Sequence, residues 1–137
     1  MPFIFIVGLP GSGKTTLSKK LLLDYPDAIL FDDSLGFLNV RKLKSMGENN
    51  LIIISDPRLT SFELFKFITS KLSNILKVYI FENNPSKCIN NIKTRCHINN
   101  TLDKISLLTN DINNFSHSYN INYYNNNMWE TLILPIP

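Results

Sequence analysis

A glycine-rich segment followed by a lysine and two threonines stands near the start of the sequence, and these residue types at this spacing can bind phosphate. The segment matches the pattern G-x-x-x-x-G-K-[ST], the Walker A loop or P-loop. In such a loop the glycines let backbone N–H groups surround phosphate oxygens, the lysine reaches the β and γ phosphates, and the hydroxyl binds Mg²⁺. We therefore predict a site for ATP and Mg²⁺, with Lys14 catalytic and Thr15 on the metal, whose nucleotide-binding residues are Gly8, Pro10, Gly11, Ser12, Gly13, Lys14, Thr15 and Thr16.

Acidic residues follow two apolar runs and could act on an acceptor hydroxyl or a metal ion. Asp32 and Asp33 come after one run, and Asp56 comes after another. A carboxylate beside the γ phosphate can accept a hydroxyl proton or orient the nucleophile, which predicts Asp32 as the base and Asp33 as an acceptor-binding residue. Which of the two is the base stays open, as does a helix-capping role for the pair. Asp56 is expected to join Thr15 at Mg²⁺, although an Asp before a proline also forms turns.

Arginine is scarce, since eleven of the fourteen basic residues are lysines. Only arginine offers a planar fork for bidentate phosphate recognition, so its few positions are informative. We expect Arg58 and Arg95 to neutralise transition-state charge and Arg41 to bind the acceptor. The alternative for each is a solvated surface ion pair, which contributes little.

The elements that must position these residues alternate between strand and helix along the chain, which is typical of an α/β fold with right-handed crossovers. The apolar runs predict five parallel strands at 3–7, 28–31, 51–55, 77–81 and 131–134. The intervening segments predict helices at 14–25, 36–45, 61–76, 86–97 and 102–115. We expect one P-loop domain, residues 1–137, with a doubly wound five-stranded parallel sheet flanked by helices and its ligands at the carboxyl ends of the strands.

The composition narrows the possible classes of protein. A net charge of +3 is mild and is compatible with a polyanionic acceptor without requiring one. Cys88 and Cys96 form no metal-binding or disulfide pattern, and no apolar run approaches the length of a membrane span. We expect an intracellular, cytoplasmic protein. The aromatic residues of the asparagine-rich stretch 115–124, together with Met128 and Trp129, are expected to pack, and stacking on a nucleobase is the alternative.

Around these residues the chain resembles P-loop kinases of the polynucleotide kinase type, including viral and bacteriophage enzymes. The segment from Gly8 to Thr16 is similar to that family's G-x-P-G-S-G-K-[ST]-T loop, and Pro10 is more specific than a general Walker A loop requires. The pair Asp32-Asp33 resembles the family's Asp-Asp, whose first member is the base. Arg95 stands where a lid arginine is expected. The resemblance implies a kinase, in the host cytoplasm if the protein is viral.

The function predicted from the sequence is transfer of the γ phosphoryl group of ATP to a hydroxyl of a nucleic acid or nucleotide. A 5'-hydroxyl end and a hydroxymethylated base in DNA are the two forms of acceptor that we expect. A kinase for a small metabolite or a nucleoside is an alternative, and an ATPase or nucleotide-sensing module without an acceptor is another. The choice of ATP over GTP stays open, and a small acceptor region makes a homodimer an option.

Overall fold

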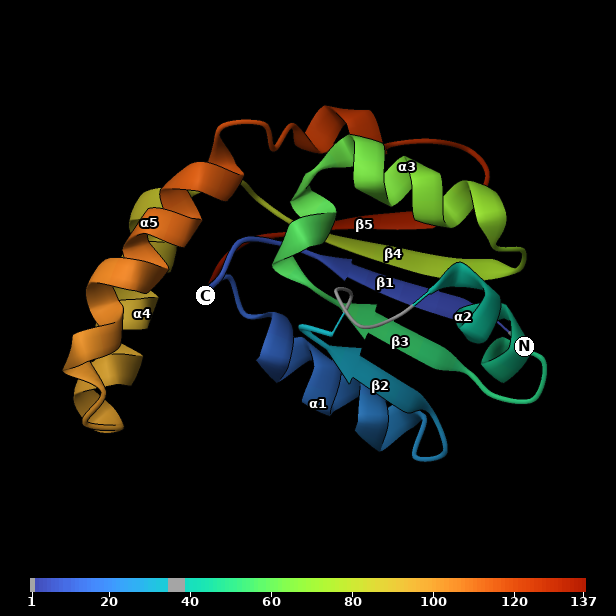
Figure 1. Cartoon of the computed structure of the whole chain (residues 1–137), viewed down its shortest axis with the longest axis horizontal. Helices are drawn as coiled ribbons and strands as arrows, with labels where there is room; N and C mark the ends of the chain where they lie inside the picture. Colours follow the sequence, from blue (N-terminus) through green and yellow to red (C-terminus); the bar gives the residue numbers. More distant parts are fainter. Residues whose placement is uncertain (1, 35–38) are drawn as a thin grey trace.

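Five parallel strands form one sheet in the computed structural model of the chain, which describes residues 2–34 and 39–137. The strand order is β2-β3-β1-β4-β5, so the strand that precedes the P-loop lies in the centre (Figure 1). Every neighbouring pair runs parallel. The strands are β1 (Phe3–Val7), β2 (Ile29–Asp32), β3 (Ile52–Ser55), β4 (Ile75–Phe81) and β5 (Glu130–Leu134). This confirms the predicted five-stranded α/β fold.

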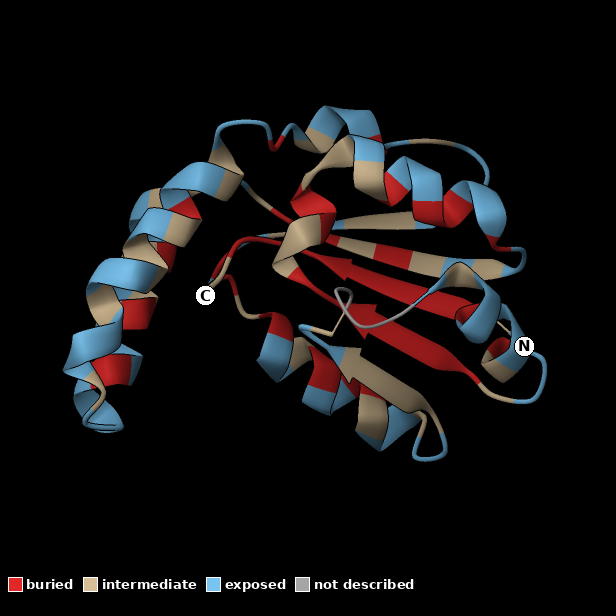
Figure 2. Ribbon diagram, viewed as in Figure 1, coloured by how far each residue is buried: buried red, intermediate tan, exposed pale blue. Residues whose placement is uncertain are grey.

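The core is built on β1 and β3, two of the three inner strands. Their residues are all apolar except the serine that ends β3. Every residue of β1 and β3 is buried, whereas the edge strands β2 and β5 are only partly covered (Figure 2). Strands of a parallel sheet covered on both faces read as continuous apolar runs, which is why these segments could be found in the sequence. The buried centre holds the strand ends, and the residues just beyond them, in fixed positions.

The helices follow the predicted alternation, with α1 (Lys14–Asp24), α2 (Val40–Gly47), α3 (Phe62–Lys71), α4 (Pro85–Ile98) and α5 (Ile105–Ser116). Short 3-10 segments, which we label η2, η3 and η4, occupy Pro57–Thr60, Leu102–Lys104 and Ile121–Tyr124. The strands point toward the left of Figure 1, and α4 and α5 lie side by side beyond their carboxyl ends. That arrangement makes the α4–α5 pair a wall facing the predicted site.

The third predicted helix, 61–76, is too long. α3 ends at Lys71, and Asn74 has a left-handed backbone with φ of 60°, a conformation that asparagine tolerates better than most residues. The carbonyl of Asn74 accepts a hydrogen bond from the N–H of Phe3 at 3.0 Å, and Ile75 then pairs with Phe3 in the sheet. Pairing with β1 therefore converts the end of the predicted helix into the start of β4.

The start of the second predicted helix, Gly36, lies outside the described residues. The described part of this segment begins at Asn39, whose side chain accepts a hydrogen bond from the N–H of Lys42 at 2.8 Å and caps α2. At its other end, α2 packs on the amino end of β1, since a Cβ added at Gly47 would lie 2.5 Å from the ring of Phe3. α2 thus begins at a local capping signal and ends against the amino edge of the sheet.

The aromatic segment before β5 packs against the sheet and α3. Tyr119 and Tyr124 are buried, and their hydroxyls donate hydrogen bonds to the carbonyls of Phe81 and Leu59. Trp129 stacks edge-on against Phe65 with ring centroids 6.1 Å apart. We expected the residues of this region to pack rather than to stack on a base. This expectation is wrong for Met128, whose side chain is 82% exposed.

Within the described residues, no helix is long and apolar enough to cross a membrane. Cys88 and Cys96 are buried free thiols on α4, as the sequence led us to expect.

Candidate active site

The P-loop connects β1 to α1 and needs its glycines for two reasons. Gly11 and Gly13 have φ of 81° and 107°, in the left-handed region that disfavours side chains. A Cβ added at Gly11 would also lie 2.6 Å from the carbonyl oxygen of Cys88 on α4. The loop is therefore pressed directly against α4, which helps to hold its backbone N–H groups in place.

Replacing Gly11 with alanine is expected to destabilise the fold by about 2 kcal/mol or more, because a left-handed alanine alone costs about 1–3 kcal/mol and the new methyl group meets backbone. Thermal unfolding followed by circular dichroism measures the effect. Asn90→Ala, an exposed position on α4, is the matched control. A melting temperature for Gly11→Ala equal to that of the control would contradict the tight loop packing.

Lys14 is held inside the P-loop. Its side chain is buried, and Nζ donates a hydrogen bond to the carbonyl of Leu9 at 2.9 Å. Desolvation lowers the pKa of Lys14, and the nearby charges of Asp33 and Asp32 oppose that shift. An ammonium group has three donors, so the bond to Leu9 leaves donors for a phosphate. The lysine is placed where the pattern predicts it.

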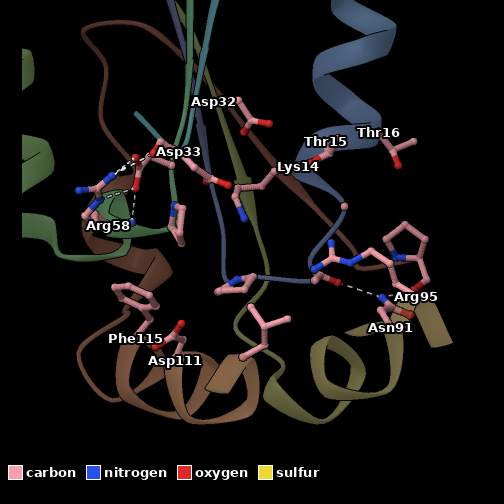
Figure 3. Close-up of a pocket in the computed structure, with 17 residues that line it drawn as sticks. Lys14, Thr15, Thr16, Asp32, Asp33, Arg58, Asn91, Arg95, Asp111 and Phe115 are labelled. Atoms are coloured by element: carbon pink, nitrogen blue, oxygen red, sulfur yellow. Dashed lines mark hydrogen bonds and ion pairs between the residues drawn. The ribbon is translucent and has the colours of Figure 1, made fainter. Parts of the chain in front are cut away.

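The carboxylates of Asp32 and Asp33 lie at the carboxyl end of β2, opposite the P-loop (Figure 3). Asp32 is the last residue of the strand, in register with Ser55 of β3. Asp33 turns away with φ of 54° while its N–H still donates to the carbonyl of Ser55 at 2.8 Å. The pKa of Asp33 is raised, first because its carboxyl group is partly desolvated and second because the negative charge of Asp32 lies nearby. The residue as a whole is nevertheless exposed.

Asp56 and Arg58 form a bidentate pair that sequence reasoning did not predict. Asp56 is almost completely buried, and its Oδ1 accepts hydrogen bonds from the Arg58 N–H and Nε at 2.9 and 3.0 Å. The Arg58 Nη2 donates to Asp56 Oδ2 at 2.9 Å and to the carbonyl of Asp33 at 3.2 Å. The hydrogen bond to Asp56 raises the pKa of Arg58. Arg58 thus links the chain after β3 to the chain after β2.

Replacing Arg58 with glutamine is expected to lower the stability by about 1–3 kcal/mol, because the buried Asp56 loses charged hydrogen-bond partners. Chemical denaturation at neutral pH measures the loss. Arg41→Gln, on the exposed side of α2, is the control and should stay within about 0.5 kcal/mol of the unaltered chain. Equal stability of the two variants would show that the pair contributes nothing to folding.

A cavity of about 710 Å³ joins these parts and is bounded on its far side by α4 and α5. Most of the site residues predicted from the sequence line it, namely Pro10, Gly11, Gly13, Lys14, Thr15, Thr16, Asp32, Asp33, Asp56, Arg58 and Arg95. Gly8 and Ser12 are in the P-loop but do not line the cavity. Arg41 is exposed on α2 and does not line it either, so the structure does not bring this predicted acceptor-binding residue to the site.

The site residues predicted from the sequence do not include five lining residues that come from distant segments, namely Asn91, Leu108, Asp111, Phe115 and Pro137. Asn91 of α4 donates through Nδ2 to the carbonyls of Gly11 at 3.0 Å and Pro137 at 3.2 Å. Asp111 and Phe115, one turn apart on α5, face the cavity from the side opposite Asn91 and Arg95 (Figure 3). No motif marks these positions, because only the packing of α4 and α5 beyond the strand ends brings them to the site.

The P-loop end of the cavity fits a nucleotide phosphate chain with Mg²⁺. Ser12 is fully buried in the loop, and its Oγ has no hydrogen-bond partner within the described residues. Thr15 is exposed in the first turn of α1 and lines the cavity. The described residues contain no group of three or more metal-ligating side chains, but Mg²⁺ commonly takes one or two protein ligands together with phosphates and water. The donor set suits this mode of binding.

The loop after the central strand and the carboxylates at the ends of β2 and β3 belong to a P-loop protein with the fold of the P-loop kinases. A gluconokinase from Sinorhizobium meliloti 1021 superposes on it with a TM-score of 0.66 and 11% identity, over 98% of this chain and 82% of that chain. The deoxyadenosine kinase of M. mycoides with bound dATP superposes with a TM-score of 0.55 and 12% identity, over 99% of this chain and 91% of that chain. Such low identities show the fold alone.

The chain belongs to the same family as the uncharacterized protein R277 of Acanthamoeba polyphaga mimivirus. The two are 34% identical over an alignment of 98 residues, and the alignment covers 67% of this chain and 71% of the relative. No model of a described protein family matches the sequence. The relative is viral, as the resemblance led us to expect, whereas the polynucleotide kinase type stays a prediction.

Proposed function

We propose that the protein is a kinase that transfers the γ phosphoryl group of ATP to a hydroxyl group of an acceptor that carries a nucleobase. The observation that carries this proposal is one cavity with two chemically different walls. The P-loop with Lys14 and Thr15 forms one wall, and Asp32 and Asp33 face it. A phosphate donor and a hydroxyl acceptor need such opposed groups, because catalysis of phosphoryl transfer is mainly positioning and electrostatic stabilisation.

The donor end would hold the triphosphate through the P-loop backbone and Lys14. Thr15 is the proposed ligand of Mg²⁺, with Asp56 acting through water, since both oxygens of Asp56 already bind Arg58. Bound there, Mg²⁺ would neutralise charge on the β and γ phosphate oxygens. Arg95 of α4 is the proposed second cation beside the phosphates, and it lines the cavity on the side of the P-loop. This arrangement supports ATP with Mg²⁺ as the donor.

The acceptor end would position the hydroxyl for attack. The hydroxyl oxygen attacks the γ phosphorus, the bond from this phosphorus to the bridging oxygen breaks, ADP leaves, and the hydroxyl proton passes to a carboxylate. We propose Asp32 as that carboxylate and Asp33 as the group that binds the acceptor. Arg58 would act mainly by holding the ends of β2 and β3 in place, in addition to any effect of its charge on the transition state.

A polymeric acceptor, as the sequence predicts, remains one form of this proposal. The exposed side chains of Arg41, Lys42 and Lys44 on α2 are the basic residues expected to contact it. Figure 1 places α2 beside the amino end of β1, away from the strand ends where the cavity opens. A kinase that uses ATP and Mg²⁺ would act in the cytoplasm, the host cytoplasm if the chain, like its relative, is viral.

The test of the proposal is transfer of labelled γ phosphate from ATP with Mg²⁺ to a panel of nucleosides, nucleotides, 5'-hydroxyl oligonucleotides and DNA with hydroxymethylated bases. Label on any of these supports the kinase. Release of labelled phosphate to water, with every acceptor unlabelled, would replace it by an ATPase or nucleotide-sensing module. A polymer substrate would show strongly salt-dependent binding, because phosphate contacts release counterions.

The raised pKa of Asp33 predicts the acid side of the pH profile. The folded chain binds this proton more tightly than the unfolded chain, so the group adds stability as the pH falls through its pKa and opposes folding above it. A protonated Asp33 accepts hydrogen bonds from the acceptor less well than an ionised one. As the pH is lowered, we therefore expect kcat/KM to begin to fall at a pH that is still above the ordinary pKa of aspartate. In the Asp33→Asn variant this fall in kcat/KM should occur at a lower pH, with no loss of stability at neutral pH. If the fall occurs at the same pH as in the unaltered chain, a group other than Asp33 causes it.

A further inference from the structure

We infer that the acceptor is an unphosphorylated nucleoside, held between Phe115 and Asp111 of α5 and the carboxylates of β2. This inference rests on the proposed kinase function and concerns the acceptor half of the same cavity. It goes further than that function because it excludes acceptors that bring their own phosphate to this half. It also gives a role to two residues that no motif marks.

The two halves of the cavity differ in charge. Arg95 and Asn91 line it on the α4 side, next to the P-loop, and Lys14 lies between the halves (Figure 3). The other half contains the ion pair of Arg58 with Asp56 and three further carboxylates, those of Asp32, Asp33 and Asp111. Since the donor already brings its phosphates to Lys14, the acceptor meets a mainly negative surface.

The positive charge in that half is already balanced by a buried carboxylate. Three of the five N–H donors of Arg58 are occupied by the carboxylate of Asp56 and the carbonyl of Asp33, at distances between 2.9 and 3.2 Å. Within the described residues, Asp111 has no hydrogen bond or ion pair that would reduce its charge. A phosphate on the acceptor carries a charge of about −1.5 to −2 and would face the carboxylates of Asp33 and Asp111, beside an arginine whose charge Asp56 already balances. The wall therefore disfavours phosphorylated acceptors.

The same wall offers an apolar surface beside a hydrogen-bond acceptor. Phe115 and Leu108 are half-buried residues of α5 that line the cavity, and Asp111 lies one turn before Phe115 on the same face. Aromatic side chains stack on nucleobases of any sequence. An ionised carboxylate only accepts hydrogen bonds, so Asp111 would select a base that presents an N–H group along its edge. A sugar hydroxyl would then extend toward Asp32 and Asp33.

The experiment compares matched acceptors with the full chain, ATP and Mg²⁺. Each nucleoside is assayed beside its 3'-monophosphate, which keeps the 5'-hydroxyl, its 5'-monophosphate, which keeps the 3'-hydroxyl, and a 5'-hydroxyl oligonucleotide. We expect kcat/KM for at least one nucleoside to exceed that for each phosphorylated form by about 100-fold. A monophosphate or an oligonucleotide that equals or exceeds its nucleoside overturns the inference and leaves the kinase standing. No labelled acceptor at all overturns the proposed function itself.

Variants of α5 test the residues. Phe115→Ala should raise the KM for the nucleoside about 10–100-fold and leave the KM for ATP unchanged, since stacking contributes about that much per base. Asp111→Lys should raise the ratio of monophosphate to nucleoside kcat/KM at least 10-fold. Asp103→Asn, an exposed acidic position on η3 outside the cavity, is the control and should change neither value. An unchanged ratio in a folded Asp111→Lys variant, judged by its melting temperature, overturns the assignment of Asp111.

Discussion

Phosphoryl transfer is expected to fall at least about 100-fold when Lys14 is replaced by methionine, while the chain stays folded. Loss of one preorganised donor to developing transition-state charge costs about 100- to 1000-fold in rate, and Lys14 is the charged donor at the centre of the P-loop. The fold should tolerate the change because methionine has a similar length and removes an ammonium group whose burial lowers its pKa. Transfer of labelled phosphate and thermal unfolding measure the two effects.

Lys19→Met is the matched control for this prediction. Lys19 is an exposed lysine of the same helix, α1, so its replacement removes an equal charge without touching the cavity. The control should keep the activity and the melting temperature of the unaltered chain. If Lys14→Met keeps more than about a tenth of the activity, Lys14 does not bind the transferred phosphate, and the proposed donor end is wrong.

The second large effect is expected for Asp32→Asn, which should reduce transfer by about 100- to 10,000-fold. An amide has the shape of the carboxylate but cannot take the hydroxyl proton, and positioned general bases contribute a factor of this size. Asp32 ends the edge strand β2 and is exposed at the cavity, so the substitution removes no core contact. The KM for ATP should change little, because the P-loop binds the donor.

Asp27→Asn provides the control, since Asp27 is exposed just before β2 begins and does not line the cavity. Asp33→Asn is the informative comparison. A variant at Asp32 that stays active beside an inactive variant at Asp33 would transfer the role of base to Asp33, which has the raised pKa. Asparagine is a suitable replacement at position 33, because it tolerates the left-handed backbone of Asp33 as well as aspartate does.

Much of the framework could be predicted because it depends on local patterns. β1 lies at the predicted residues 3–7, and the other strands differ from their predicted bounds by one or two residues. Continuous apolar runs identify strands that are buried on both faces, and the P-loop pattern specifies its own backbone. The error at 61–76 arose because nothing in that segment shows that Ile75 pairs with Phe3, a contact between residues far apart in the chain.

The residues of the candidate site also differ in whether local patterns or long-range contacts determine them. The sequence by itself determined the P-loop, its lysine and hydroxyl, and the acidic residues after β2 and β3, because each follows from a motif or from its place at the end of a strand. Only the tertiary structure decided that Arg58 also binds the carbonyl of Asp33, that Arg41 stays away from the cavity, and that Asp111 and Phe115 form its far wall. These depend on how the chain ends of β2 and β3 meet and on how α4 and α5 pack beyond the sheet. The physical reason is that such contacts join segments distant in sequence, so no local periodicity records them.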